Sequence, residues 1–468
     1  MPSEQTPLLQ NDDSYDERAP LELFQEVDHY NRFKPGKKRA IVLTVAFAGL
    51  IPLFVSGSFI PSIPQIAREF ETSGAVVNLA VSASIFSACI GTLFWAVYSG
   101  YYGRRPVFLV SSIVFCVGSM GVTLSRSIRE LIAFRIFQAL GCASAFSNGV
   151  GVLGDLYRLE ERGTAMGVFY GAVLLGPAIA PVVGGTVAEL YSWRAMQAVL
   201  FASGCIFFTL ILFFFPETIH PGSSGAEKAS TTGFVILNPF KSLTLVRSPV
   251  ILCIVVAGIT NLMADFFLVV PVAYTVAKKY NITSEAAIGA LLIPDGVGSM
   301  LGAPIIGHIS DKIIAQRRRR RGGVWVPEDR LRGLKFSGLI LIPSSLLIAG
   351  YTTTYVDGTL GLVINLFCLF INGFGVDSMF TTLSAYGVDI LHDRSAEITA
   401  ASMAYRGTVI SLAIAGLLPS IDTIGLMATY TITAVISLFG YFLVWIVIQY
   451  GDRMRAYVDI GFSTAHAT

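Results

Sequence analysis

Apolar stretches about as long as a membrane-spanning helix recur along the whole chain of 468 residues. A helix needs about 20 apolar residues to cross the hydrocarbon core of a bilayer. Charged residues make up 14% of the composition, compared with roughly 25% in an ordinary soluble domain. These features exclude a soluble enzyme, a nucleic-acid-binding protein and a disordered chain. They predict an all-α membrane protein, because backbone groups in lipid must be satisfied within each helix.

A window of span length predicts twelve transmembrane helices in two groups of six. The first six lie near 40–60, 75–98, 107–124, 127–149, 166–187 and 195–215. The second six lie near 250–274, 286–307, 336–352, 358–383, 396–418 and 424–448. The predicted organisation is a disordered cytosolic tail (1–38), a six-helix bundle (39–218), a linker with an amphipathic helix (219–249), a second six-helix bundle (250–450) and a C-terminal tail (451–468).

The distribution of basic residues predicts the orientation. With both termini placed in the cytosol, most of the 33 lysines and arginines fall in cytosolic segments, as the positive-inside rule requires. The sequon at Asn281 then falls outside. The run Arg317 to Arg321 is interpreted as an anchor to anionic lipid headgroups.

A short basic motif occurs after the second span of each group. The first copy reads Ala96-Val97-Tyr98-Ser99-Gly100-Tyr101-Tyr102-Gly103-Arg104-Arg105-Pro106, and the second reads Gly307-His308-Ile309-Ser310-Asp311-Lys312. Both resemble the G-x-x-x-D-[RK]-x-G-[RK]-[RK] loop of the major facilitator superfamily. The resemblance implies two pseudo-symmetric halves packed around a cavity at the membrane midplane.

Spans four and five carry further resemblance to this superfamily. Arg135-Ile136-Phe137-Gln138-Ala139-Leu140-Gly141 is similar to its R-x-x-Q-G-x-G motif. The pattern of Gly176, Pro177, Pro181, Gly184 and Gly185 resembles the signature of drug:proton antiporters. Pro216-Glu217-Thr218 ends span six, as in many fungal members. The resemblance covers about residues 40–450 and points to the fungal twelve-span drug:proton antiporter family, whose members export drugs, polyamines and metabolites.

The first loop motif departs from the family pattern at one position. Gly100 stands where the family has an aspartate that helps to latch the cytosolic side. We therefore expect this latch to be altered, or supplied by another group. The second copy keeps Asp311 and Lys312.

Arg135 and Gln138 lie three residues apart and share one helix face. A charged group in mid-span is costly and normally faces a cavity or a partner. We expect Arg135 to face the central cavity and to tune proton or anion binding. The alternative is a structural arginine hydrogen-bonded to backbone carbonyls.

Other polar residues within the second group of spans are candidates for substrate or proton binding. They are Asn261, Asp265, Asp295, Asp377 and Arg406. Asn261 and Asp265 share a helix face, and Asp377 and Arg406 are predicted to pair across helices. The alternatives are carboxyls solvated near the outer surface and a purely structural bridge. In span five, proline bends the helix and glycine allows close approach, so we expect this helix to seal the cavity against ion leak.

The resemblance predicts a proton-coupled antiporter that exports drug-like or secondary-metabolite compounds, and not an enzyme. The alternatives are an exporter of a small organic acid, with Arg135 and Arg406 binding carboxylate, or a uniporter. Protons, a small-molecule substrate and the lipid bilayer are the expected partners of a monomer, with no nucleic acid, cofactor or metal. An acidic dileucine pattern (Glu4, Leu8, Leu9) suggests sorting adaptors. The expected location is the plasma membrane, with the vacuolar membrane as the alternative.

Overall fold

The computed structural model describes residues 32–157, 162–219, 237–390 and 395–458. The sorting pattern at Glu4, Leu8 and Leu9 lies outside the described residues. Parts of the two predicted tails and of the central linker also lie outside them.

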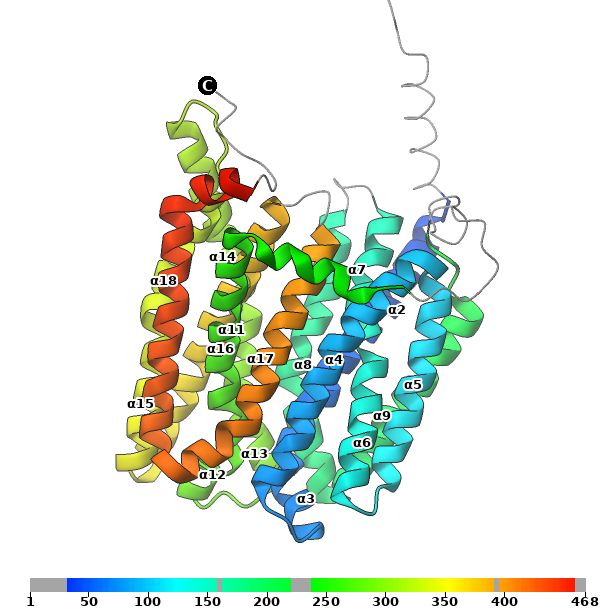
Figure 1. Cartoon of the computed structure of the whole chain (residues 1–468). Coiled ribbons are helices and arrows are strands. Elements are labelled where there is room, and N and C mark those ends of the chain that lie inside the picture. Colours follow the sequence, from blue (N-terminus) through cyan, green and yellow to red (C-terminus); the bar gives the residue numbers. More distant parts are fainter. Residues whose placement is uncertain (1–31, 158–161, 220–236, 391–394, 459–468) are drawn as a thin grey trace, which may run out of the picture.

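Long apolar helices dominate the described part of the chain (Figure 1). Twelve of them are long and apolar enough to cross a membrane, which confirms the predicted number of spans. The first group comprises α2 (Pro35–Gly57), η1 (Ile60–Ser62), α3 (Ile63–Glu69), α4 (Gly74–Tyr102), α5 (Arg104–Leu124), α6 (Ile128–Cys142), α7 (Ser144–Leu156), α8 (Arg162–Leu190) and α9 (Trp193–Phe214).

The second group of helices follows a short 3₁₀ helix, η2 (Pro239–Arg247). It comprises α11 (Pro249–Val269), η3 (Val270–Ala273), α12 (Val276–Lys279), α13 (Glu285–Leu291), α14 (Ile293–Arg320), η4 (Pro327–Leu334), the π-helical η5 (Ser337–Leu341), α15 (Ile342–Tyr355), α16 (Gly358–Ile390), α17 (Ser395–Ile424) and α18 (Leu426–Val458).

Two large apolar cores divide these helices into two bundles. One core is built by side chains from α2 and from α5 to α9. The other is built mainly by side chains from α11 to α18. Glycines allow a close crossing within the second bundle, where Gly298 and Gly302 of α14 lie against the backbone of α16. This is the way in which small residues bring membrane helices together.

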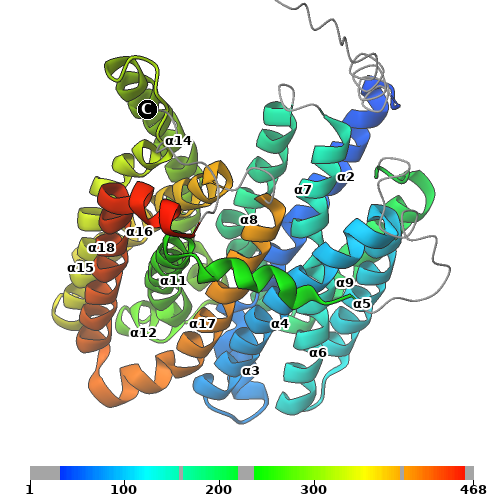
Figure 2. The same cartoon turned by 45° about the horizontal axis from the view of Figure 1, so that its top comes forward.

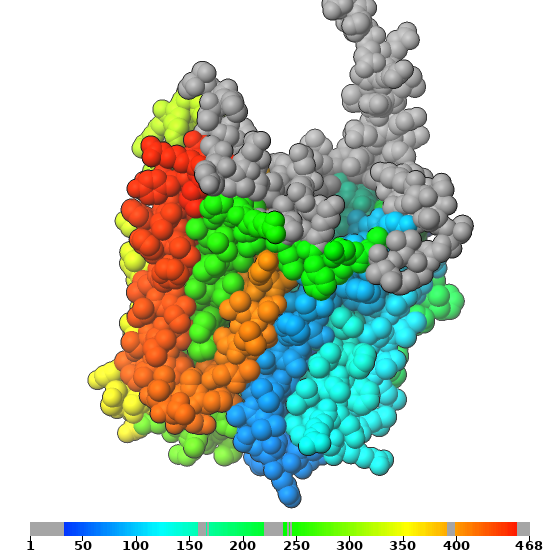
Figure 3. Space-filling view, in the orientation of Figure 1, coloured from blue at the N-terminus to red at the C-terminus, as the bar shows by residue number. Residues whose placement is uncertain are grey.

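The two bundles meet along two helix pairs. On one side, α4 and α17 lie side by side (Figures 1 and 3). Asn78 donates to the carbonyl of Ile414 (2.6 Å), and Ser82 donates to the carbonyl of Ser411 (2.5 Å). On the other side, α8 packs against α13 and α14. Figure 2 tilts the two bundles so that the end that carries the basic loops, which we call the basic end, comes forward.

The linker segment predicted as an amphipathic helix forms a 3₁₀ helix, η2. In a 3₁₀ helix, side chains three residues apart lie on the same face. This places Leu243 and Val246 together, and both pack against the bundles. The hydroxyl of Tyr405 also donates to the carbonyl of Leu243 (3.5 Å). The helix η2 therefore contacts α4 of one bundle and α11 and α17 of the other.

Candidate functional site

Three aspartates from different helices of the second bundle converge in one acidic cluster. Asp265 lies on α11, Asp295 on α14 and Asp377 on α16. The carboxyl groups of Asp265 and Asp295 lie within hydrogen-bonding range of each other, and both interact electrostatically with Asp377. The cluster brings together side chains that are up to 112 residues apart along the chain.

Neutral polar groups surround the acidic cluster. Asn372 donates to Asp265 (3.3 Å), and Ser299 donates to Asp377. Oδ1 of Asp295 is buried without a hydrogen-bond partner in the described part of the chain. Among the described residues, no lysine or arginine forms an ion pair with any of the three carboxyls. The arrangement can therefore hold a proton or a positively charged group.

Asn261 lies one turn before Asp265 on α11, and its side chain also faces α16. It donates to the carbonyl of Val376 (2.8 Å), while its own Oδ1 is buried without a partner among the described residues. Asn261 and Asp265 thus share a face, as predicted. Asn261 holds α11 against α16, and Asp265 lies at the acidic cluster.

Arg135 and Gln138 form a buried polar network in the first bundle. The guanidinium of Arg135 donates to the carbonyl of Val55 (3.1 Å) and to Gln138 (3.0 Å), and it lies over the ring of Phe59. Gln138 in turn donates to Ser119 and Gln197. Only 1% of Arg135 is exposed. In this conformation Arg135 is enclosed and hydrogen-bonded to a backbone carbonyl, which matches the alternative of a structural arginine.

Arg406 does not pair with Asp377, contrary to the prediction. Its Nε donates to the carbonyl of Ser402 (3.2 Å), and its guanidinium lies 4.6 Å from the ring centre of Phe380. Asp377 faces Ser299 of α14 instead. The two residues belong to separate clusters, because Asp377 is directed towards α14 while Arg406 approaches the next turn of α16.

The glycines and prolines of span five lie at two closely packed interfaces of α8. Within the first bundle, a Cβ at Gly184 would lie 2.3 Å from the carbonyl oxygen of Ser58, and one at Gly176 would lie 2.6 Å from Leu53. Between the bundles, a Cβ at Gly185 would lie 2.2 Å from the carbonyl oxygen of Glu285.

A second glycine makes the reciprocal contact between the bundles. A Cβ at Gly289 of α13 would lie 2.2 Å from the carbonyl oxygen of Pro181. Pro177 and Pro181 both lie inside the long helix α8. The predicted antiporter motif thus serves two interfaces: Gly176 and Gly184 pack within the first bundle, while Pro181 and Gly185 contact the second bundle.

Polar contacts close the same interface at the end opposite the basic end. Arg68 of α3 pairs with Glu285 of α13 (2.7 Å). Glu189 of α8 accepts from the hydroxyl of Ser284 and from the backbone N–H of Ala286, the latter at 2.9 Å. These contacts join the first bundle to the start of α13.

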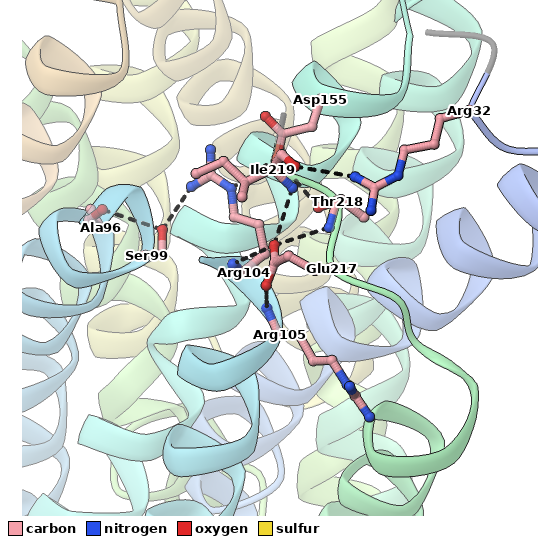
Figure 4. A network of polar contacts seen from close by, with 9 residues as sticks. All are labelled: Arg32, Ala96, Ser99, Arg104, Arg105, Asp155, Glu217, Thr218 and Ile219. Atoms are coloured by element: carbon pink, nitrogen blue, oxygen red, sulfur yellow. Dashed lines mark hydrogen bonds and ion pairs between the residues drawn. The ribbon is translucent and has the colours of Figure 1, made fainter. Parts of the chain in front are cut away.

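The first loop motif is held by acidic groups that the sequence analysis missed (Figure 4). Arg104 pairs with Asp155 of α7 (3.0 Å) and donates to the hydroxyl of Ser99 (2.7 Å). Glu217 accepts from the backbone N–H groups of Arg104 (2.9 Å) and Arg105 (3.1 Å). Asp155 and Glu217 thus supply carboxylates at this loop, where Gly100 replaces the family aspartate. The carboxylate of Glu217 caps the start of α5.

Gly103 makes this capping arrangement possible. Its backbone has φ 104° and ψ 164°, a region open almost only to glycine. A Cβ there would also lie 2.6 Å from Glu217.

We expect Gly103→Ala to destabilise the protein by about 1–3 kcal/mol, which is the usual cost of such backbone strain. Thermal unfolding of the purified protein in detergent measures this effect. Gly100→Ala is the matched control, because it lies within α4 and a Cβ there would contact nothing within 4 Å. Equal unfolding temperatures for the two variants would contradict the role assigned to Gly103.

The second loop motif joins a larger network at the basic end. Asp311 pairs with Arg330 of η4 (3.6 Å), which also pairs with Asp389 of α16 (2.6 Å). Lys312 is exposed. The motif therefore ties α14 to η4 and α16.

The basic run at the end of α14 is partly engaged within the protein. Arg321 makes two hydrogen bonds to the buried Asp329 (2.6 and 2.9 Å), which raise the pKa of its guanidinium. Arg317 pairs with the same carboxylate at 3.8 Å. Arg318, Arg319 and Arg320 are exposed, although Arg318 also donates to the carbonyl of Gly323 (3.0 Å). These three are the members of the run that form no ion pair among the described residues, and the predicted contact with lipid headgroups falls to them.

Comparisons with known proteins agree with the resemblance in the motifs. A family model described as Major Facilitator Superfamily matches residues 45–416. The chain is 36% identical to the MFS antiporter QDR3 of Candida albicans over 43% of this chain and 29% of that protein. It is 27% identical to the efflux pump radE of Floropilus chiversii over 89% of this chain and 80% of that protein. It is 32% identical to citrate exporter 1 of Aspergillus niger over 40% of this chain and 36% of that protein.

Proposed function

Since the chain belongs to the major facilitator superfamily, we propose that it is a proton-coupled antiporter that exports drug-like or secondary-metabolite organic compounds by alternating access. The family and its efflux-pump relatives identify it as a secondary transporter of small molecules. Proton exchange, antiport and the class of exported compound go beyond that identification.

The acidic cluster is the observation that carries the proposal. Asp265, Asp295 and Asp377 lie together with no ion-paired lysine or arginine among the described residues. Three ionised carboxylates in such a cluster would repel one another, and isolated charge within the membrane is costly. The cluster therefore holds at least one proton while no cation is bound. Release of that proton as substrate enters would couple the two movements.

The interface between the bundles supports alternating access. Contacts of α8 with the second bundle run from Gly185 at Glu285 to Ala178 at Gly296. Beyond them, towards the basic end, a Cβ at Gly171 would have open space around it. The bundles are thus sealed at the opposite end in this state, and the Arg68–Glu285 pair must separate for that end to open.

A small organic acid is the second candidate substrate class. Citrate exporter 1 is among the relatives, and Arg406 is a buried cation without a carboxylate partner among the described residues. Guanidinium groups bind carboxylates through paired hydrogen bonds. A uniporter remains the mechanistic alternative to proton exchange.

The proposed location is the plasma membrane, with the vacuolar membrane as the alternative. The proposed orientation places both termini and the basic end in the cytosol. The positive-inside rule supports this orientation, because the loop arginines and the exposed run Arg318 to Arg320 lie at the basic end. The sequon at Asn281 would then lie outside.

Substrate-induced proton movement in proteoliposomes tests the proposal. The purified protein is reconstituted with an internal pH dye and exposed to amphipathic drugs and organic acids. A transported compound is expected to move protons in the opposite direction and to be driven by an imposed pH gradient. Movement of labelled compound with no proton movement and no response to the gradient would establish a uniporter.

A further inference from the structure

A small pocket lies between α11, α16 and α17, apart from the acidic cluster. Arg406 lines it together with the hydroxyl-bearing residues Ser384, Thr399 and Ser402. Its volume is about 20 Å³, and a single water needs roughly 10–15 Å³ by this kind of measure. The pocket therefore admits one small polar group and cannot enclose a drug-sized molecule.

The polar side chains that line this pocket come from α16 and α17, and Ile254 and Val255 of α11 complete its wall. Thr399, Ser402 and Arg406 follow one another at intervals of three and four residues, so they share one face of α17. Ser384 and Gly387 face them from α16. A Cβ at Gly387 would be in ordinary contact with Ile398 (3.4 Å) and Ile254 (3.6 Å), so a branched side chain there would extend into the pocket. The absence of a side chain at Gly387 keeps the pocket open.

Arg406 brings an uncompensated positive charge to the pocket. Only 5% of the residue is exposed. Its guanidinium contacts the carbonyl of Ser402 and the ring of Phe380, and no carboxylate in the described part of the chain forms an ion pair with it. A buried cation without an anion is costly, so this position is suited to a ligand that supplies the anion.

We propose that this pocket is a carboxylate subsite, which binds a carboxylate group of the exported compound through Arg406. The guanidinium offers two parallel N–H donors to a carboxylate, and the hydroxyls of Ser384 and Ser402 offer further donors. The size of the pocket limits it to the carboxylate itself, and the rest of the compound lies outside it. This inference rests on the proposed export function and names the chemical class of its substrate.

The subsite lies beside the acidic cluster on the same helix. Asp377 and Ser384 are seven residues apart on α16, which corresponds to about 10 Å at a rise of 1.5 Å per residue. Phe380, over which Arg406 lies, comes between them. The subsite and the acidic cluster are therefore separate positions along α16. Arg135 has no such role in this conformation, because Val55, Gln138 and Phe59 enclose it.

Matched acids and amides test the subsite directly. Binding of benzoate and succinate to the purified full-length protein is measured by calorimetry, with benzamide and succinamide as uncharged counterparts. The acids are expected to bind and the amides to bind at least tenfold more weakly. Arg406→Gln is expected to weaken binding of the acids at least tenfold. Equal binding of acids and amides to the unaltered protein would overturn the proposal.

Two further variants guard against loss of folding in Arg406→Gln. Gly387→Val keeps the arginine but fills the pocket, so it should also weaken binding of the acids at least tenfold. Gly387→Ala adds only an ordinary contact and should retain more of this binding. Arg129→Gln removes an exposed arginine of α6 and should bind as the unaltered protein does. Undiminished acid binding in both Arg406→Gln and Gly387→Val would overturn the assignment.

The same reconstituted protein separates this inference from the proposed function. If acids bind at Arg406 but no compound moves protons, the carboxylate subsite is supported and the proposed proton coupling is refuted. If a compound that carries a carboxylate drives proton movement equally well in the unaltered protein and in Arg406→Gln, antiport is supported and the carboxylate subsite is refuted.

Discussion

Asp295→Asn is expected to reduce transport driven by a pH gradient at least tenfold. Asparagine has nearly the shape of aspartate but cannot release a proton at any working pH. Asp295 is 7% exposed, it contacts Asp265, and its Oδ1 has no partner among the described residues. Of the three aspartates, it is the one with a buried carboxyl oxygen that no described group hydrogen-bonds. Uptake of labelled substrate into proteoliposomes, with and without the gradient, measures the effect.

Asp422→Asn is the matched control for this prediction. Asp422 is an exposed aspartate on α17, away from the acidic cluster, so its replacement should leave transport within about twofold of the unaltered protein. Size-exclusion chromatography establishes that both variants are folded. Gradient-driven transport by Asp295→Asn at the unaltered rate would show that its carboxyl does not carry the proton.

The fold was predictable because span length and apolar content are local properties. Each predicted window falls on one of the twelve apolar helices. The contact between Arg135 and Gln138 was also predictable, because residues three apart share a helix face. Short-range periodicity contains this information without any knowledge of how the helices pack.

The partners of the site residues depend on helix rotation and packing, which one sequence does not reveal. Glu217 reaches the backbone of Arg104 from a position 113 residues away. The expected pair of Asp377 and Arg406 is absent, because opposite charge on neighbouring helices does not fix the faces that meet. Asp155 offered one signal that was overlooked, since an acidic residue at the end of a span is a natural partner for the basic loop.

The loop motif lacks the family aspartate at Gly100, but its basic residues still have carboxylate partners. The family aspartate is absent, yet Arg104 pairs with Asp155, and Glu217 caps the start of α5. Both carboxylates come from other segments of the first bundle. Loss of the motif aspartate therefore does not imply loss of order at this loop.

Gly185→Val is expected to reduce transport at least tenfold while the protein stays folded. The Cβ would lie 2.2 Å from the carbonyl oxygen of Glu285, so α8 and α13 could not approach each other as they do here. Because this contact lies between the bundles, its loss disfavours the state in which the end opposite the basic end is closed. Neither apolar core is disrupted. Uptake of labelled substrate and the amount of monodisperse protein measure the two effects.

Two other glycines of α8 distinguish this explanation from general damage. Gly184→Val meets Ser58 within the same bundle, so we expect loss of folded protein. A Cβ at Gly171 would meet nothing within 4 Å, so Gly171→Val should retain both folding and transport. A crosslink between cysteines placed at Arg68 and Glu285, in a background without native cysteines, reports closure directly. It should form readily with Gly185 present and poorly with Gly185→Val. Equal crosslinking would show that α8 and α13 close without this glycine.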